Sequence, residues 1–423
     1  MVSTSPAVVI DNGSYTTKAG FALEDLPSLV FNSNYLINTS DGAKAVIGDD
    51  EILAEPENEV MTLMENGLIY NYDHIIDNWN YVYENIDNNN SINPKEFPLV
   101  ITEQTWNTSK NKLAATQIVF ETLEVPLFSL VKTPLAQLYH TGKATGLVVD
   151  IGSAVASVTP ILDGIIQSKV SFHTKYAGDF VNLSILNHLE KFGTLEDFLP
   201  AKYHSASSSF KNFYASRNLI QEFKVASTPE YQFHKGIQVK SNGVDFFSSL
   251  FQPQLLNVPN VNIPEPVLDK PQTHGLVNLI FHSLKSLEAS IVQSGGQNSS
   301  RFARFNEILK TLLANIVITG GSSLATGLSD RILNDVRAYA ALYFPNYGFN
   351  PYYIQTISNY QAGDVNDTWN RLLGGWLGAS NLAGMLNDTG EETNGVNIAL
   401  DNWFVSKSDY EELGEDLILE KFK

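Results

Sequence analysis

The sequence of 423 residues contains no cysteine, which excludes disulfide bonds and thiolate chemistry. It also lacks any apolar run close to the ~20 residues that a membrane-spanning helix needs. The stretch from Met1 to Pro6 has neither the basic start nor the long apolar run of a secretory signal. We therefore expect a soluble intracellular protein that does not contact a membrane.

Positive charge is scarce as well, with 27 basic against 46 acidic residues and a net charge of −19. Proteins that bind nucleic acid directly use clustered Lys and Arg to displace counterions from phosphates. No such cluster occurs, so we expect no direct binding to nucleic acid. The acidity indicates either simple solubility or attraction of a basic protein partner, and both interpretations stay open. The 8 histidines show no metal-ligand spacing.

Apolar β-branched runs that end in an aspartate and a glycine are the first positive signal. Residues 7–14 read Ala-Val-Val-Ile-Asp-Asn-Gly-Ser, and residues 147–153 read Leu-Val-Val-Asp-Ile-Gly-Ser. Each predicts a buried strand closed by a tight turn. Because such strands alternate with helix-length segments, the sequence predicts an α/β fold. The duplicated strand and turn predict two similar domains that face one cleft.

These turns belong to an ordered series of motifs that extends along almost the whole chain. The series includes Lys18-Ala19-Gly20-Phe21, Gly67-Leu68-Ile69, Pro98-Leu99-Val100-Ile101-Thr102-Glu103, Leu250-Phe251-Gln252-Pro253, Gly320-Gly321-Ser322-Ser323, Gly374-Gly375 and Asp409-Tyr410-Glu411. In this order the motifs resemble actin. The resemblance implies an actin-like fold, with two facing duplicated α/β domains, or four subdomains, around a nucleotide cleft.

The resemblance also implies where the two domains lie along the chain. The first would comprise residues 1–140 plus 373–423, with an outer subdomain at about 33–66. The second would comprise residues 141–372, with an outer subdomain at about 176–271. The Ser-rich stretch 205–209 is interpreted as peripheral.

A nucleotide site follows from the same resemblance. The two Gly/Ser turns would wrap the phosphates of ATP, and Asp11 and Asp150 would face Mg²⁺ through water. Lys18 would reach the phosphates, while Glu222 and the turn at 320–322 would hold the nucleoside. The implied set is Asp11, Gly13, Ser14, Lys18, Asp150, Gly152, Ser153, Gly178, Glu222, Gly320, Gly321 and Ser322. Alternatively, the turns only close the two domains together without a ligand.

Departures from the family pattern decide the predicted activity. Thr133 and Ser157 stand where the family has the glutamine and the histidine that position its attacking water. Neither hydroxyl is a credible general base at its ordinary pKa. Other replacements in the cleft are Tyr15 for a glycine, Gln221 for a lysine, Ala325 for an aromatic residue and Thr368 for a second lysine. We therefore predict no catalytic residues and no enzyme activity, with ATP and Mg²⁺ bound weakly if at all.

The run Gly375-Trp376-Leu377-Gly378-Ala379 and the C-terminal motif resemble the seventh class of actin-related proteins, known from budding yeasts. That resemblance implies a nuclear subunit of the SWI/SNF and RSC chromatin remodellers. It would pair with a second actin-related protein and bind the helix that precedes the remodeller's ATPase motor. The present chain lacks a long insertion of that class in the outer part of the second domain.

The implied mode of binding is a partner helix seated in an apolar groove. The matching residues are Tyr139, Gly142, Gly164, Ile165, Leu373 and Leu377, each of which could instead serve core packing. Residues 39–51 do not resemble the loop that joins actin subunits, so we expect no filament. A cytoskeletal or dynactin-type actin-related protein and a residual ATPase of the actin and sugar-kinase superfamily are the alternatives.

Overall fold

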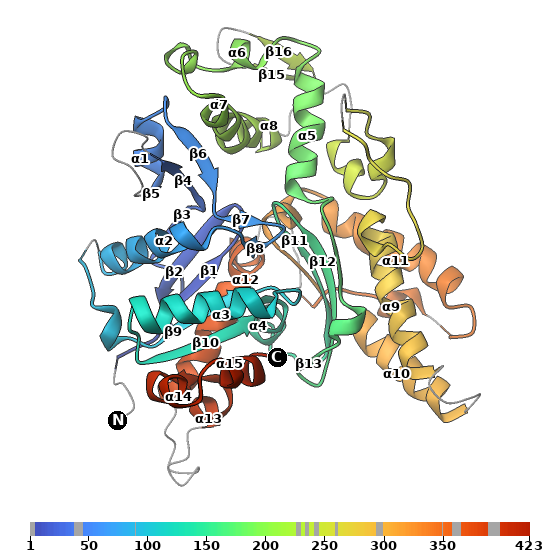
Figure 1. Cartoon of the computed structure of the whole chain (residues 1–423). Helices are drawn as coiled ribbons and strands as arrows, with labels where there is room; N and C mark the ends of the chain where they lie inside the picture. Colours follow the sequence, from blue (N-terminus) through green and yellow to red (C-terminus); the bar gives the residue numbers. More distant parts are fainter. Residues whose placement is uncertain are drawn as a thin grey trace.

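The computed structural model describes residues 5–37, 45–88, 90–225, 230–232, 237–240, 245–258, 261–292, 299–348, 350–357, 365–387 and 398–423. Two twisted sheets form the centres of two α/β domains that face each other (Figure 1). The predicted α/β fold is confirmed. Within the described ranges, no helix combines the length and the apolar character that crossing a membrane requires.

The first sheet has the strand order β18-β10-β9-β1-β2-β3. Its strands are β1 (Val8–Asn12), β2 (Thr16–Phe21), β3 (Leu29–Asn32), β9 (Leu99–Glu103), β10 (Leu127–Lys132) and β18 (Val405–Ser406). Strand β1 lies antiparallel to β2 and parallel to β9. All five residues of β1 are buried, because elements cover both faces of this central strand. This burial explains its continuous apolar run.

The second sheet repeats this pattern with the strand order β13-β12-β11-β17, and β14 pairs with β12. Its strands are β11 (Gly146–Ile151), β12 (Ala156–Leu162), β13 (Ile165–Ile166), β14 (Phe172–Thr174) and β17 (Ile316–Thr319). Strand β11 is antiparallel to β12 and parallel to β17, as β1 is to β2 and β9. Asp11 and Asp150 therefore occupy equivalent places near the ends of β1 and β11. The predicted duplication is confirmed.

Helices cover the two sheets and join them. They are α2 (Tyr72–Asn85), α3 (Ser109–Gln117), α4 (Thr133–His140), α9 (Leu276–Val292), α10 (Ser299–Ala314), α11 (Leu328–Tyr343), α12 (Val365–Gly384), α13 (Ile398–Trp403), α14 (Lys407–Leu413) and α15 (Glu415–Lys421). Helix α12 packs on α4 and touches strands of both sheets. A Cβ added at Gly378 would come within 1.9 Å of the Ala136 carbonyl oxygen, so glycine is what lets the two helices touch. The predicted domain boundary at 372/373 falls inside α12, and the boundaries remain predictions.

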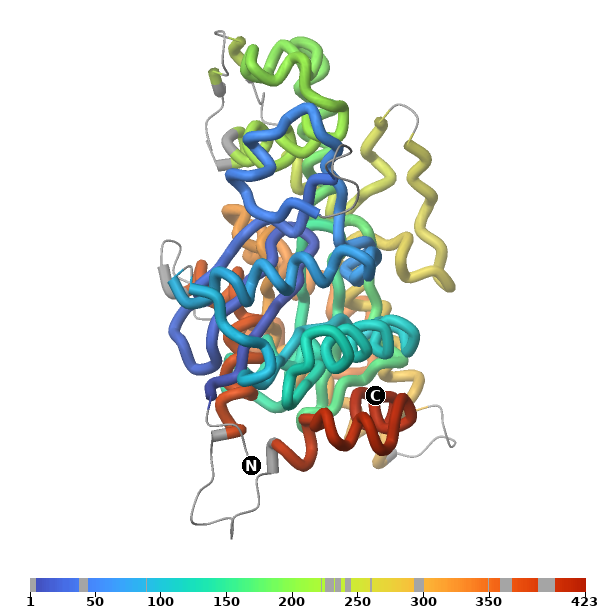
Figure 2. Tube along the Cα trace, turned by 60° about the vertical axis from the view of Figure 1, so that its left-hand side comes forward, coloured from blue at the N-terminus to red at the C-terminus, as the bar shows by residue number. Residues whose placement is uncertain are grey.

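Two outer lobes stand above the sheets, and Figures 1 and 2 both show them side by side. The first lobe contains β4 (Asn34–Ile37), β5 (Ala45–Val46), α1 (Asp49–Ala54) and β6 (Glu59–Thr62). The second contains α5 (Gly178–Leu189), α6 (Leu195–Phe198), α7 (Ser208–Tyr214), a π-helical turn (Ala215–Leu219), α8 (Ile220–Val225), β15 (Glu230–Gln232) and β16 (Gln238–Lys240). Part of the segment 39–51, namely 39–44, lies outside the described residues.

The outer lobes share a hydrophobic core. Its buried residues are Leu36 and Ile52 from the first lobe and Tyr203, Ala206, Phe210 and Phe213 from the second. The Ser207 hydroxyl donates to the Asn58 carbonyl oxygen (2.8 Å), and the Val60 amide donates to the Ser209 hydroxyl (2.9 Å). The interpretation of residues 205–209 as peripheral was therefore wrong for Ser207 and Ser209, whose hydroxyls pair with backbone groups of the opposite lobe. Ser205 and Ser208 are exposed.

We expect Phe210→Ala to separate the lobes, because Phe210 is fully buried in their shared core. Removing a buried phenyl ring costs about 3–5 kcal/mol, from lost burial and the cavity left behind. Urea unfolding would measure the loss, and hydrogen exchange of β6 should accelerate. Phe302→Ala serves as the control, since Phe302 is 37% exposed and should cost much less. Equal effects of the two variants would contradict the shared core.

Candidate functional site

A cavity of about 910 Å³ lies between the two domains. The residues that line it include 11 of the 12 in the predicted nucleotide set, and these are Asp11, Gly13, Ser14, Lys18, Asp150, Gly152, Ser153, Gly178, Gly320, Gly321 and Ser322. The remaining residue, Glu222, belongs to α8, but its side chain is outside the described part of the chain. The fold thus brings together motifs that are distant in sequence, such as those at Gly13 and Gly320.

The tips of the two hairpins present unused backbone donors to this cavity. The Gly13 amide donates to the Thr16 carbonyl oxygen (3.1 Å), and the Gly152 amide donates to the Val155 carbonyl oxygen (2.9 Å), which closes each turn. The amides that follow, of Ser14 and Tyr15 and of Ser153 and Ala154, make no hydrogen bond to any described residue. Successive free amides in a turn form a nest that favours an anion. The two hairpins therefore fit the phosphates of a nucleotide.

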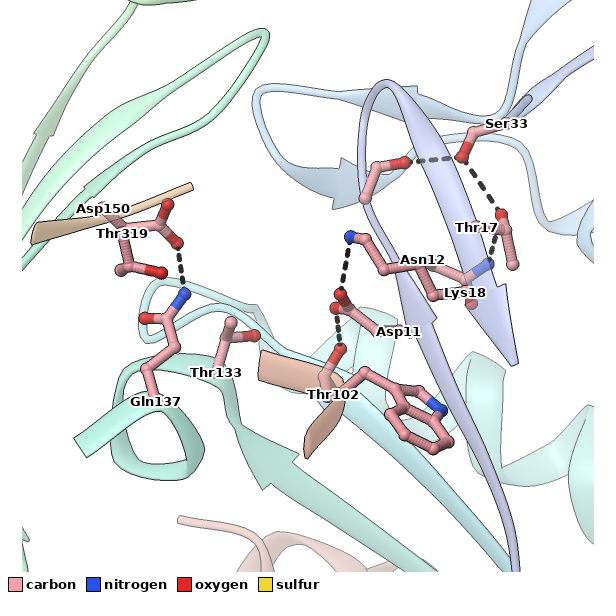
Figure 3. Close-up of polar contacts among 12 residues, drawn as sticks. Asp11, Asn12, Thr17, Lys18, Ser33, Thr102, Thr133, Gln137, Asp150 and Thr319 are labelled. Atoms are coloured by element: carbon pink, nitrogen blue, oxygen red, sulfur yellow. Dashed lines mark hydrogen bonds and ion pairs between the residues drawn. The ribbon is translucent and has the colours of Figure 1, made fainter. Parts of the chain in front are cut away.

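The two aspartates face the cavity with different partners (Figure 3). Asp11 accepts hydrogen bonds from Lys18 Nζ (3.0 Å) and from Thr102 Oγ1 (2.6 Å). Asp150 accepts one from Gln137 Nε2 (2.9 Å). Burial raises the pKa of Asp150, and the nearby charge of Asp11 adds to the shift, whereas the Gln137 hydrogen bond opposes it. Asp11 is therefore held as a charged ion pair, whereas Asp150 is biased towards its neutral form.

Gln137 lines the cavity and was not among the residues predicted from the motifs. Its side chain is 5% exposed and lines the cavity, and its Oε1 atom is buried without a hydrogen-bond partner. It lies four residues after Thr133 on α4, and residues at this spacing share one face of a helix. The Thr133 hydroxyl itself donates to the Glu103 carbonyl oxygen (3.2 Å). The family has a glutamine at the position of Thr133. In this chain a carboxamide lines the cavity one helical turn later, at Gln137.

Tyr15 takes part in a contact between the hairpin and the opposite lobe. The Arg217 guanidinium lies 3.5 Å from the centre of the Tyr15 ring, within cation–π range. Its Nη1 donates to the Tyr15 carbonyl oxygen and its Nη2 to Asn34 Oδ1, both at 2.7 Å. Tyr15 therefore serves as the platform for Arg217. The motif comparison gave no sign of Arg217.

No histidine lines the cavity among the residues that the structure describes. Ser157 is 4% exposed and pairs in register with His173 of the neighbouring strand β14. The His173 ring stacks on Trp106 at 4.1 Å, and burial lowers its pKa. Its imidazole is therefore separated from the cavity by the indole, which itself lines the wall.

The family model for actin matches residues 2–233 and 234–423 of this sequence. The chain belongs to the actin family. The actin-like fold predicted from the ordered motifs is confirmed. The two facing domains correspond to its duplicated halves, and the hairpin-lined cavity corresponds to the cleft between them.

Three relatives match this actin-family chain over nearly its full length. Actin-related protein 4 of Yarrowia lipolytica is 28% identical and covers 100% of this chain and 99% of its own. Actin-related protein 7 of Saccharomyces cerevisiae is 27% identical, with 98% of both chains covered. The SWI/SNF and RSC complexes subunit arp42 of Schizosaccharomyces pombe is 28% identical and covers 98% of this chain and 97% of its own. The predicted resemblance to actin-related proteins is confirmed.

The predicted partner groove of this actin-family chain is only partly accessible. Ile165 on β13 is 67% exposed, and the Tyr139 hydroxyl lies over Gly164, 2.5 Å from where a Cβ would stand. Gly142 follows α4 and has φ +72°. A Cβ added there would have no atom within 4 Å, so this position is open. Leu377 is half-buried against a core cluster. Leu373 is 1% exposed, so its assignment to the groove surface was wrong, because α12 turns it into the core.

Oxygen atoms suited to Mg²⁺ converge at the aspartates. Mg²⁺ prefers carboxylate, carbonyl and water oxygens, and the carboxylates of Asp11 and Asp150 would supply the protein's share. In the described ranges no three His, Cys, Asp or Glu side chains form a metal site alone. Bound with a nucleotide, the ion would neutralise phosphate charge, with these residues holding it.

The raised pKa of Asp150 predicts that acid weakens cation binding, since a proton and the cation compete for the carboxylate. Below that pKa, the affinity of the chain for Mg²⁺ with nucleotide should fall by up to about tenfold per pH unit. Calorimetric titrations between pH 8 and pH 5 would measure it. In Asp150→Asn the dependence of this affinity on pH should vanish. An unchanged dependence in that variant would show that another group titrates.

Proposed function

We propose that this chain is a non-catalytic actin-related subunit of a SWI/SNF- or RSC-type chromatin-remodelling complex in the nucleus. It pairs with a second actin-related protein and binds the helix that precedes the remodeller's ATPase motor. The observation that carries this proposal is the full-length similarity to a subunit named for the SWI/SNF and RSC complexes.

The exposed end of the second sheet supports a helix-docking role. Ile165 exposes two thirds of its surface beside the Tyr139 hydroxyl and Gly164, where a partner side chain can insert. An amphipathic helix that seats apolar anchors in such a groove gains affinity from their burial. The net charge of −19 would steer a Lys- and Arg-rich helix towards it.

The cavity chemistry supports the absence of catalysis. Thr133 and Ser157 carry hydroxyl groups in the cavity, and Gln137 carries a neutral carboxamide. A general base needs a pKa near the working pH and reach to the attacking water. Both carboxylates of the cavity are engaged, Asp11 by Lys18 and Thr102 and Asp150 by Gln137.

Ile165→Arg should break partner binding without unfolding the chain, because the side chain is exposed and makes no core contact. Burying an unpaired guanidinium in an apolar interface should reduce recovery of the remodeller ATPase subunit by at least about tenfold. Affinity purification with quantitative mass spectrometry would measure it. Leu268→Arg is the matched control, since Leu268 is 75% exposed in the second domain away from the groove. Recovery of cytoskeletal partners alone from the native chain would refute the proposal.

A second candidate, residual ATP hydrolysis, is favoured by one observation, the carboxamide of Gln137 in the cavity. We expect single-turnover hydrolysis at the uncatalysed background in both the native chain and Gln137→Ala, because Gln137 Nε2 is bonded to Asp150 and hydroxyls replace both water-positioning residues of the family. Rapid-quench measurement of phosphate release would test this. A rate above background that falls in Gln137→Ala would overturn the non-catalytic assignment.

A further inference from the structure

Large exposed apolar side chains gather on the second domain, away from the cavity. They are Tyr339 and Leu342 near the end of α11, and Tyr352 and Tyr353 in a short 3₁₀ turn (Pro351–Tyr353). Tyr352 is 88% exposed and Leu342 is 72% exposed. These four side chains are called the apolar strip below. Exposed apolar surface of this kind marks sites where another protein binds.

The two parts of the apolar strip are neighbours, because the chain turns back after α11 and lies between α11 and α10. The Arg337 guanidinium of α11 donates to the Ile354 carbonyl oxygen from Nε (3.0 Å) and from Nη2 (2.9 Å). The Gln355 amide donates to the Leu313 carbonyl oxygen near the end of α10 (3.0 Å). The 3₁₀ turn therefore packs against both helices.

Local hydrogen bonds hold the turn that carries the two tyrosines. Asn350 Oδ1 accepts from the Tyr352 amide (3.1 Å), and the Asn350 carbonyl oxygen accepts from the Tyr353 amide (3.0 Å). Pro351 has its φ fixed by its ring at the start of the turn. A backbone held in this way loses little conformational entropy when a partner binds. The tyrosines are thus exposed on a preformed support.

The charge in this part of the chain differs in sign from that of the whole chain. Residues 338–357 contain no charged side chain. Residues 299–357 contain five basic and three acidic residues, whereas the whole chain contains 27 basic and 46 acidic. Depletion of charge and enrichment of tyrosine are typical of the centre of a protein–protein interface. The apolar strip has both properties.

Two arginines next to this segment have no acidic partner. Arg301 and Arg304, near the start of α10, make no ion pair with any residue that the structure describes. Phe302 lies between them in sequence, and its ring centre is 6.3 Å from that of Tyr347, in the segment that leads to the turn. Unpaired positive charge beside an apolar surface favours an acidic partner and disfavours a basic one.

Charge complementarity assigns the two partners of the proposed function to two different surfaces. The Lys- and Arg-rich helix expected at the groove near Ile165 would be repelled by Arg301 and Arg304, so the apolar strip does not suit it. We propose that the apolar strip binds the second actin-related protein, through an acidic surface of that protein that carries apolar side chains. This inference rests on the proposed function and adds the surface at which the two proteins pair.

Affinity purification of the full chain with quantitative mass spectrometry tests the pairing surface. A double variant, Tyr352→Ala with Tyr353→Ala, should lower recovery of the second actin-related protein at least about tenfold relative to the ATPase subunit, since buried tyrosines often anchor an interface. Thermal unfolding should show the variant to be folded, because both side chains are exposed. Tyr70→Ala is the matched control, since Tyr70 is 67% exposed but lies in the first domain.

A second variant, Arg301→Glu with Arg304→Glu, tests the charge of the partner. It should lower the same recovery about fivefold at about 0.1 M salt but not at about 1 M salt, where charges are screened beyond ~3 Å. Lys202→Glu is its control, because Lys202 is exposed in the outer lobe.

Three outcomes would overturn the pairing surface. These are unchanged recovery in the tyrosine variant, an equal loss at both salt concentrations in the arginine variant, and capture of a second copy of this chain in place of the actin-related protein. If the native chain recovered no remodeller ATPase subunit at all, the proposed function itself would be refuted. The two failures are therefore distinguishable.

Discussion

Two aspartates at the equivalent ends of two duplicated strands, Asp11 buried and Asp150 half-buried, set the constraint on which the cleft depends. Like-charged carboxylates that face one low-dielectric cavity cannot both remain ionised without compensation. The chain compensates them differently: Lys18 and Thr102 hold Asp11, whereas Gln137 holds Asp150, whose pKa burial raises. The hairpins, the helix α4 that carries Gln137 and the closely packed α12 are all arranged around this pair.

A side chain that a positional comparison finds missing can return from a neighbouring helical turn. The carboxamide absent at Thr133 is present at Gln137. A helix repeats its face every three to four residues, so a shift of one turn preserves which surface a side chain reaches. The cavity therefore contains a carboxamide, whereas no histidine lines it among the described residues.

Contacts within the protein itself hold the two outer lobes together above the cleft. The shared core around Phe210, the hydroxyls of Ser207 and Ser209, and the stacking of Arg217 on Tyr15 all join the outer lobes above the cavity. In a cleft closed by a ligand alone, the closed state would depend on the ligand's binding free energy. Here apolar burial and hydrogen bonds between the lobes already favour closure.

The sequence by itself determined the duplicated strands and turns, the α/β class, the actin family and 11 of the 12 predicted nucleotide-site residues that line the cavity, because these follow from local periodicity and from an ordered series of motifs. It misplaced Leu373 and the serines at 207 and 209, and it missed Gln137 and Arg217. Whether a helical side chain faces the core, the cavity or the opposite lobe depends on the rotation of its helix. Only packing between segments distant in sequence fixes that rotation, and so only the tertiary structure decided it.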